Sequence, residues 1–151
     1  MYFSEEVAFF NQSCSSQEEA LKKLANALFK KGLVKDTFFQ AVVDREKDYP
    51  TGLSINGIGV AIPHTDSIYI IKPQIGFMSL KEPVIFKDMG DDQHEIEVNT
   101  IFMLGVLKSE HQIRMLQKLV ELFQDEALFK SVIVSKNIDE LKAIMKKANI
   151  D

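Results

Sequence analysis

Hydrophobic side chains recur every three or four positions in two stretches near the start of the chain and three near its end, which predicts five amphipathic helices. The first helix is expected to begin after Ser16, which forms a capping box with Glu19, and to end at Gly32. The expected N-caps of the other four are Asp36, Ser109, Asp125 and Asn137. In the helix after Ser109, the expected buried stripe consists of Ile113, Leu116, Val120 and Phe123.

Between the second and third helices the pattern changes to the two-residue alternation of strands. Ile58, Val60 and Ile62 alternate with small residues as far as Pro63, which has no backbone N–H to continue strand pairing. Further strands are expected at Ile75–Leu80, Val84–Phe86 and Glu95–Leu107, and a loop is expected at Pro50–Gly57. Helices before and after a group of strands predict a three-layer α/β sandwich.

The composition narrows the class of protein. A chain of 151 residues with 46% hydrophobic side chains is long enough for one core, so we expect a single domain. No basic leader and no long apolar run are present, and Cys14 is the only cysteine, so we expect a cytoplasmic protein without membrane insertion or disulfides. The net charge of −4, without a basic run, argues against binding to nucleic acid.

Two histidines are the candidates for chemistry. His64 lies just past the end of a predicted strand, where a neutral imidazole nitrogen can attack phosphorus or hold a metal; the alternative is an ordinary strand-end histidine. With Ser109 as N-cap, His111 is the second residue of its helix, where the helix dipole favours a neutral ring; the alternative is a surface histidine. The two can share a crevice if their strands are parallel neighbours.

Other polar residues carry weaker signals. Arg45 can offer its planar guanidinium to a phosphate or form an exposed charge pair at a helix end, and Asp66 can orient His64 or make a turn. Acidic residues concentrate between Glu82 and Glu97, as a solvated loop or as a docking rim for basic partners, and His94 is expected in that loop. The histidines show no compact ligand spacing, so neither metal nor cofactor is expected.

Four motifs together resemble a known family: Arg45-Glu46, Pro50-Thr-Gly-Leu53, Gly59-Val-Ala-Ile-Pro-His64 and Glu110-His111. They are similar to the type-2 IIA component of the bacterial phosphoenolpyruvate-dependent sugar phosphotransferase system, in the fructose/mannitol superfamily. The resemblance implies one domain over residues 3–148, with a mixed central β-sheet flanked by helices on both faces. Within the family, Tyr49-Pro-Thr-Gly-Leu53 is most similar to the galactitol-type branch.

The resemblance also implies a phosphocarrier cycle. Phosphorylated HPr would pass a phosphoryl group to His64, and phospho-His64 would pass it to a cysteine of a sugar-specific IIB component that serves a membrane IIC component. By the same resemblance His111 would stabilise the phosphoryl group and Arg45 would balance its charge, while Leu53 and Ile55 are candidates for an apolar partner patch. Two other functions remain open. The protein could be a regulatory IIA-like phosphoprotein, which signals by binding another protein, or a catalytically inert relative.

Overall fold

Five strands form one mixed sheet in the computed structural model of the protein, which describes residues 1–151. The strands are β1 (Ala8–Gln12), β2 (Gly52–Ile55), β3 (Ile58–Ala61), β4 (Gln74–Lys87) and β5 (Glu95–Gly105). Their order across the sheet is β1-β4-β5-β3-β2. The pairs β1–β4 and β5–β3 run parallel, whereas β4–β5 and β3–β2 run antiparallel. The carboxyl ends of β3 and β5 therefore lie at the same edge of the sheet.

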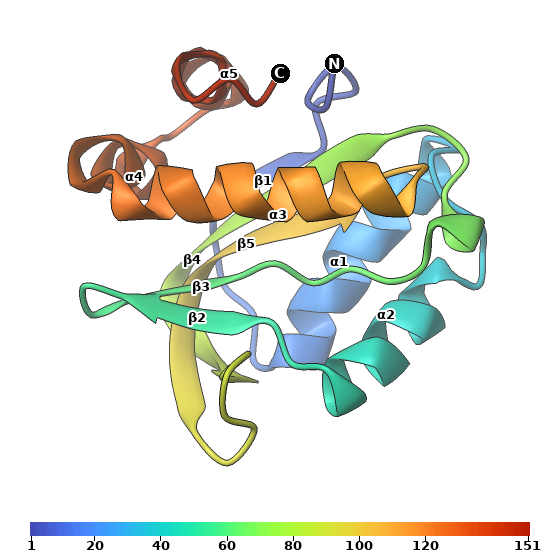
Figure 1. Ribbon diagram of the computed structural model, residues 1–151, viewed down its shortest axis with the longest axis horizontal. Helices are drawn as coiled ribbons and strands as arrows, with labels where there is room; N and C mark the ends of the chain where they lie inside the picture. Colours follow the sequence, from blue (N-terminus) through green and yellow to red (C-terminus); the bar gives the residue numbers. More distant parts are fainter.

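Helices cover both faces of this sheet, which confirms the predicted three-layer sandwich (Figure 1). They are α1 (Gln17–Lys30), α2 (Phe38–Asp48), α3 (Ser109–Gln124), α4 (Glu126–Val134) and α5 (Ile138–Lys147), with a short 3₁₀ helix at Ser67–Tyr69. One core cluster joins α1 and α2 to the sheet, and a second joins α3, α4 and α5 to the opposite face. None of these helices has the length and apolar character needed to cross a membrane.

Aromatic side chains dominate the core on the α3 side. Phe77 of β4 and Phe102 of β5 pack edge to face with their ring centroids 5.1 Å apart. The series continues through Phe123 of α3 and Phe129 of α4, at centroid distances of 5.6 and 5.0 Å. Such pairs add to the free energy of burial alone, so these rings fix α3 and α4 against the sheet.

Three of the five expected N-caps are confirmed. The side chains of Ser16, Asp125 and Asn137 each accept a hydrogen bond from the backbone N–H three residues later. The predictions for Asp36 and Ser109 are wrong, because α2 follows Thr37 and α3 follows Lys108, and neither helix has a side-chain cap. A tight turn, with the Phe38 N–H bonded to the Lys35 carbonyl, leads into α2 instead.

The strand predictions need three corrections. The segment predicted as a loop contains β2, which pairs with β3 in a hairpin whose turn residues Asn56 and Gly57 have φ values of +52° and +79°. Asn-Gly is the sequence that favours this two-residue hairpin turn, and it stabilises the pairing of β2 with β3 although β2 is short. The two strands predicted at 75–80 and 84–86 are one, β4, with an irregularity between Ser79 and Val84. β1, at the sheet edge, was not predicted.

The buried stripe of α3 also differs from the prediction. Met115, Leu119, Leu122 and Phe123 face the core. Of the predicted residues only Phe123 is fully buried; Leu116 and Val120 are half-buried and Ile113 is 60% exposed. The apolar face of α3 is wider than the stripe that the sheet covers. The part of this face that the sheet leaves uncovered lies beside His64.

Candidate functional site

Backbone hydrogen bonds on both sides hold the segment that leads to His64. β3 pairs with β5 through Val60 and Ala61. Beyond the strand, the Ile62 N–H donates to the Thr51 carbonyl at 3.3 Å, and the Pro63 carbonyl accepts from the Leu104 N–H at 3.0 Å. Pro63 has no N–H to extend the ladder, so the chain leaves the sheet at this point. The position of His64 just past a strand end is thus confirmed.

The imidazole of His64 is half-buried and held in one orientation. Its Nδ1 lies 2.8 Å from the Ile62 carbonyl oxygen. A carbonyl only accepts hydrogen bonds, so Nδ1 carries the proton and the lone pair of the neutral ring is on Nε2. Burial lowers the pKa of His64 below its ordinary 6.5, and the positive charge of Arg45 acts in the same direction. The bond to Ile62 and the charge of Asp66 oppose this shift in the pKa without reversing it.

A cavity of about 530 Å³ contains His64. It is lined by the end of α2, the start of β2, the turn between β4 and β5, and one residue of α3: Arg45, Asp48, Tyr49, Pro50, Thr51, His64, Met89, Gly90, Asp91, Asp92 and Leu116. Segments distant in sequence therefore meet around one imidazole. The lining combines three carboxylates and apolar side chains with one cation, Arg45, which is the only positive charge that the lining offers to an anionic group.

Arg45 presents its guanidinium at this cavity. The guanidinium lies 4.7 Å from the centroid of the Tyr49 ring, and Nη1 lies 3.4 Å from Asp66 Oδ1. Its Nε is buried and has no hydrogen-bond partner. An unpartnered buried donor beside His64 can be satisfied by an oxygen of a bound anion. Of the two alternatives for Asp66, the turn is confirmed, since its carbonyl accepts from the Tyr69 N–H at the start of the 3₁₀ helix. Its carboxylate pairs with Arg45, and the Ile62 carbonyl orients the His64 ring.

The structure places His111 apart from the His64 cavity. β3 and β5 are parallel neighbours, as the shared-crevice hypothesis requires. His111 is the third residue of α3 and lines a separate hollow of about 150 Å³ with Tyr2, Arg114, Met115 and Lys118. The two histidines thus follow adjacent strands at the same sheet edge but line different hollows.

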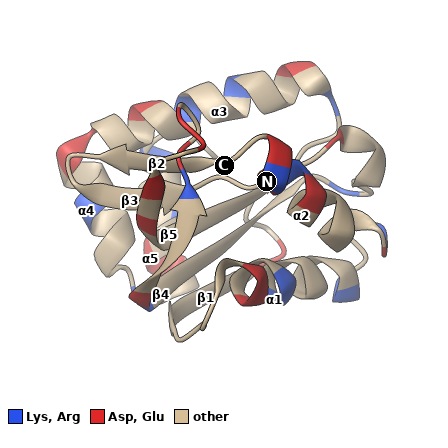
Figure 2. Ribbon diagram, turned by 90° about the horizontal axis from the view of Figure 1, so that it is seen from below, with Lys and Arg blue, Asp and Glu red and all other residues tan.

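Of the acidic segment between Glu82 and Glu97, only residues 88–94 form the turn between β4 and β5, because Glu82 lies in β4 and Glu95 and Glu97 lie in β5. Two of its carboxylates brace the turn: Asp88 Oδ1 accepts from the Gly90 N–H and Asp91 Oδ1 from the Gln93 N–H. The Met89 N–H donates to the Gly52 carbonyl at 2.8 Å, which ties the turn to β2. Figure 2 shows the acidic colour on this turn. Since His94 is exposed in the same turn, its predicted place is confirmed.

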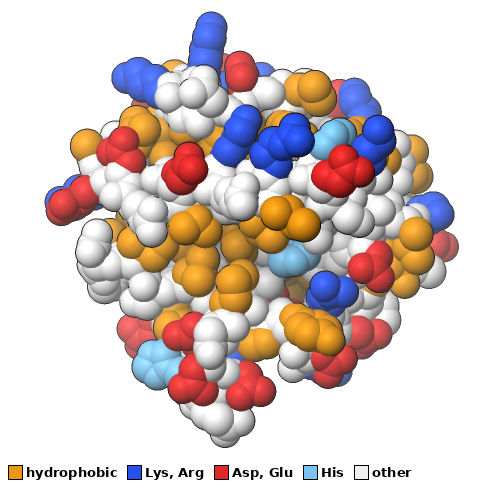
Figure 3. All heavy atoms as spheres, in the orientation of Figure 1, with side chains coloured by type: hydrophobic (Ala, Val, Ile, Leu, Met, Phe, Trp, Pro, Cys, Tyr) orange, Lys and Arg blue, Asp and Glu red, His pale blue; other side chains and the backbone are white.

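An apolar surface adjoins His64. Hydrophobic side chains gather between α3 and the β2–β3 hairpin, with basic side chains along α3 and acidic ones beyond the hairpin (Figure 3). Ile113 is 60% exposed and Met89 42%, while Leu53, Ile55 and Leu116 are half-buried. A second hollow of about 530 Å³ is lined by Ile62, Met89, Leu116, Gln117, Val120 and Glu121. Exposed apolar patches of this kind mark protein-binding surfaces.

Glu46 and Thr51 belong to the site's support, although their motifs suggested no such role. Glu46 is only 5% exposed, and its two carboxylate oxygens accept from the Thr51 N–H and Oγ, both at 2.7 Å. Burial raises the pKa of Glu46 to about 7, against the opposing effect of the bonds from Thr51. The sequence holds a signal for this burial, since Phe38, Val42 and Glu46 recur every four residues on the buried face of α2.

Comparison with protein families gives a match over almost the whole chain. The family model described as "Phosphoenolpyruvate-dependent sugar phosphotransferase system, EIIA 2" matches residues 1–148. Among curated proteins, the galactitol-specific EIIA component of Escherichia coli K12 is 28% identical over 117 residues, which cover 78% of this chain and 77% of the relative. The mannitol-specific enzyme IIA component of Staphylococcus aureus is 30% identical over 148 residues, covering 97% and 96%.

Solved structures share the fold. In the complex of mannitol enzyme IIA with phosphorylated mannitol enzyme IIB from Escherichia coli, the matching chain has a TM-score of 0.77 at 24% identity, covering 94% of this chain and 95% of that one. The two chains therefore share a fold.

Proposed function

Because the chain belongs to the EIIA 2 family of the phosphoenolpyruvate-dependent sugar phosphotransferase system, whose members are phosphotransferase subunits of sugar transport systems, we propose a specific transfer step for it. His64 accepts a phosphoryl group from phosphorylated HPr and passes it to a cysteine of a cognate IIB component. The protein does so in the cytoplasm, without a metal or cofactor.

The hydrogen bond from His64 Nδ1 to the Ile62 carbonyl carries this proposal. It leaves the Nε2 lone pair as the nucleophile. In the first step Nε2 bonds to phosphorus while the P–N bond of phospho-HPr breaks, and its electron pair returns to the HPr imidazole. In the second step the IIB thiolate attacks phosphorus, and the electron pair of the His64 P–N bond returns to Nε2. Throughout, Nδ1 keeps its proton on the Ile62 carbonyl.

Two further residues support the phosphoryl group in this proposal. Arg45 lines the same cavity and has a free buried Nε, so it can donate to a phosphoryl oxygen and balance its charge. We assign the second stabilising role to His111, which follows the neighbouring parallel strand. His111 lines a hollow of its own, so it would meet the phosphoryl group when a docked partner covers both hollows.

We propose that the transport system takes up a hexitol, and that galactitol is the first candidate among the hexitols. The Tyr49–Leu53 segment favours the galactitol branch, and the relatives bear galactitol and mannitol names. Mannitol IIA forms a complex with mannitol IIB, which makes a IIB component the expected acceptor here. The apolar surface beside His64 is then the docking face for both donor and acceptor, used in turn and therefore transiently.

The test is the intact mass of the protein after incubation with phosphoenolpyruvate, enzyme I and HPr. Wild type is expected to gain one acid-labile phosphoryl group, and His64→Ala none, because the variant lacks the Nε2 that would accept it. His94→Ala is the matched control, since His94 is exposed in the β4–β5 turn and should leave labelling intact. Labelling of His64→Ala, or no labelling of wild type, would contradict the proposal. Transfer onward to a galactitol-type IIB then separates the transport role from the regulatory alternative.

A further inference from the structure

A buried carboxylate connects α2 to the start of β2. Glu46 lies in the last turn of α2, and Thr51 follows it by five residues, at the entry to β2. The Glu46 carboxylate accepts both the N–H and the hydroxyl of Thr51, each at 2.7 Å. Both residues are almost fully buried, at 5% and 2% exposure. These two bonds fix the Thr51 peptide and its side chain as a unit.

The backbone of Thr51 is in turn hydrogen-bonded to Ile62, the residue whose carbonyl orients His64. The Thr51 carbonyl accepts from the Ile62 N–H at 3.3 Å. The Ile62 carbonyl, in the next peptide, accepts from His64 Nδ1 at 2.8 Å. Three sets of hydrogen bonds, joined through the backbones of Thr51 and Ile62, therefore connect Glu46 to His64.

We propose that Glu46 is a positioning residue for His64: by anchoring Thr51 it holds the Ile62 carbonyl in place, and so keeps the proton of the imidazole on Nδ1 and the lone pair on Nε2. The catalytic consequence of this inference rests on the proposed function of His64. Without the anchor, the Ile62 carbonyl can rotate away, and the imidazole gains access to the other tautomer and to other orientations. A misdirected lone pair attacks phosphorus more slowly.

The cost of burying Glu46 supports a role beyond stability. No cation pairs with its carboxylate, whose partners are both on Thr51, and burial raises the pKa of the group to about 7. An apolar side chain at this position would extend the buried stripe of Phe38 and Val42 without a desolvation penalty. A carboxylate does what an apolar side chain cannot: it accepts two hydrogen bonds and fixes the direction of a backbone peptide.

The test combines Glu46→Gln with ¹⁵N NMR of the His64 ring, whose nitrogen shifts report which atom carries the proton. Glutamine has the shape of glutamate, but its amide NH₂ donates where the second carboxylate oxygen accepts, so the bond with the Thr51 hydroxyl has to reverse its direction. The fraction of the Nε2–H tautomer is expected to rise about threefold, and the rate of phosphoryl acceptance to fall about tenfold. Asp44→Asn, on the exposed face of the same helix, is the matched control and should change neither.

A second pair of variants keeps the proposal testable if Glu46→Gln does not fold. Thr51→Val removes the hydroxyl donor at nearly constant volume, whereas Thr51→Ser retains it. The valine variant should shift the tautomer ratio as Glu46→Gln does, and the serine variant should restore it. An unchanged ratio in folded Glu46→Gln, or equal ratios in the two Thr51 variants, would overturn the proposal. Wild type that accepts no phosphoryl group would refute the function of His64, while the tautomer ratios would still decide the role of Glu46.

Discussion

At the scale of the residue, His64 owes its properties to its immediate surroundings. Half-burial lowers its pKa and the Ile62 carbonyl accepts a hydrogen bond from its Nδ1–H, so the ring is neutral with one free nitrogen. The nearby Arg45 lowers the pKa further and offers a donor to the group that the free nitrogen would receive. The groups that activate the nucleophile and balance its charge are therefore local. Ile62 is two residues before His64, and Arg45 lies in the last turn of α2.

The role assigned to His111 gives the first prediction at this scale. His111→Ala should still gain a phosphoryl group on His64, because His111 lines a different hollow. Transfer onward to IIB should slow by roughly tenfold or more, since one stabilising donor is lost. Single-turnover transfer from phosphorylated protein to IIB measures this step. A normal onward rate would exclude His111 from the reaction.

Glu46 gives a prediction about pH. Its pKa is about 7 in the folded protein and ordinarily 4.5, so between these values the folded state holds a proton that the unfolded state has released. The free energy of unfolding should therefore fall as pH rises from 4.5 to about 7, by of order 3 kcal/mol from this group. Chemical denaturation across that pH range measures it.

The control for this prediction is Glu46→Gln, which cannot titrate. His64 acts in the opposite direction, since its lowered pKa makes the folded state more stable as pH rises towards 6.5. The contribution of Glu46 is therefore the difference in slope between wild type and the glutamine variant. Parallel stability curves for the two proteins would show that Glu46 is ionised in both the folded and the unfolded state.

At the scale of the element, β3 is the support of the site, and its approach to β5 is unusually close. A side chain on Gly59 would place its Cβ 1.8 Å from the Glu97 carbonyl oxygen. Only glycine permits this packing. Because Gly59 has no side chain, β3 can pack closely against β5, and this fixes the position of its carboxyl end and of His64.

Gly59→Ala should therefore destabilise the protein by about 3 kcal/mol or more, because β3 has to move away from β5. Gly57→Ala is the matched control in the same hairpin. It meets no atom within 4 Å but has a φ of +79°, so its cost should be about 1 kcal/mol. Thermal unfolding of both variants compares them. Equal losses of stability would mean that the contact with Glu97 does not constrain β3.

Elements with local signals were predictable from the sequence, and those decided by distant contacts were not. Ser16, Asp125 and Asn137 act on N–H groups three residues away, so their caps could be identified. β1 is a short edge strand that is defined by its pairing with the distant β4. β2 is also a short edge strand, and its local signal, the Asn-Gly turn of the β2–β3 hairpin, was overlooked. The buried stripe of α3 depends on which part of a wide apolar face meets the sheet, which the helix pattern alone does not specify.

The candidate site shows the same division. The strand end and proline predicted where His64 lies. That its strand runs parallel beside the strand before His111 was only a condition of the shared-crevice hypothesis, and the β3–β5 pairing fulfils it. The cavity lining could not be predicted, because Arg45 and Met89 reach it through the packing of α2 and of a turn 44 residues further along. Asp66 is close to His64 in sequence, yet its carboxylate is drawn to Arg45.

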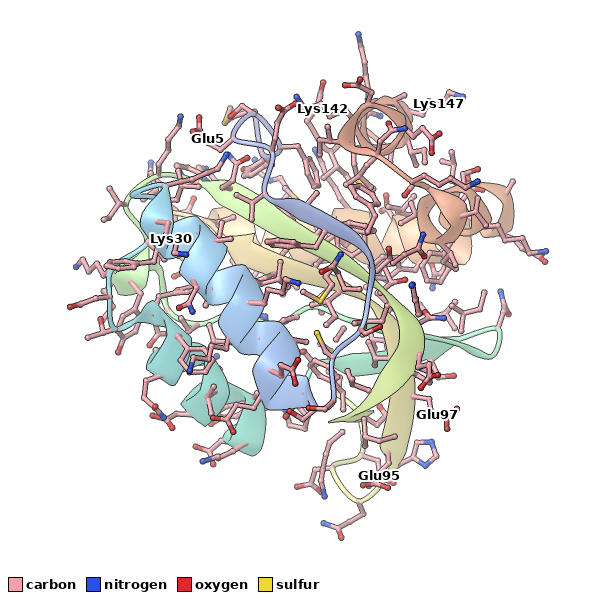
Figure 4. All side chains as sticks on the ribbon, turned by 180° about the vertical axis from the view of Figure 1, so that it is seen from behind. Glu5, Lys30, Glu95, Glu97, Lys142 and Lys147 are labelled. Carbon is pink, nitrogen blue, oxygen red and sulfur yellow. The ribbon has the colours of Figure 1, made fainter.

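At the scale of the whole molecule, charge is unevenly distributed. Glu95 and Glu97 lie at one end of the sheet (Figure 4). Lys142 and Lys147 of α5 lie near the other end together with Glu5, and there Lys142 pairs with Glu6. The acidic turn at the first end also contributes Asp91 and Asp92 to the His64 cavity. A basic partner is attracted to that side of the apolar surface before it docks.

Asp91→Asn together with Asp92→Asn should slow phosphoryl transfer from phospho-HPr about two- to fivefold at low ionic strength, through slower association. The rate at saturating HPr should stay the same, because neither residue contacts His64. Added salt should reduce the difference between variant and wild type, since screening weakens attraction between exposed charges. An effect confined to the saturated rate would instead place these carboxylates in the chemistry.

The two ends of the described chain lie close together in Figure 1. Met1 and Asp151 line the same hollow, which shares no residue with the cavity of His64. A short linker could therefore join them, and the chain could be reopened at the exposed Asn56–Gly57 turn. In such a circular permutant β2 and β3 would no longer be consecutive, and whether the hairpin still forms would show how far its pairing depends on covalent connection.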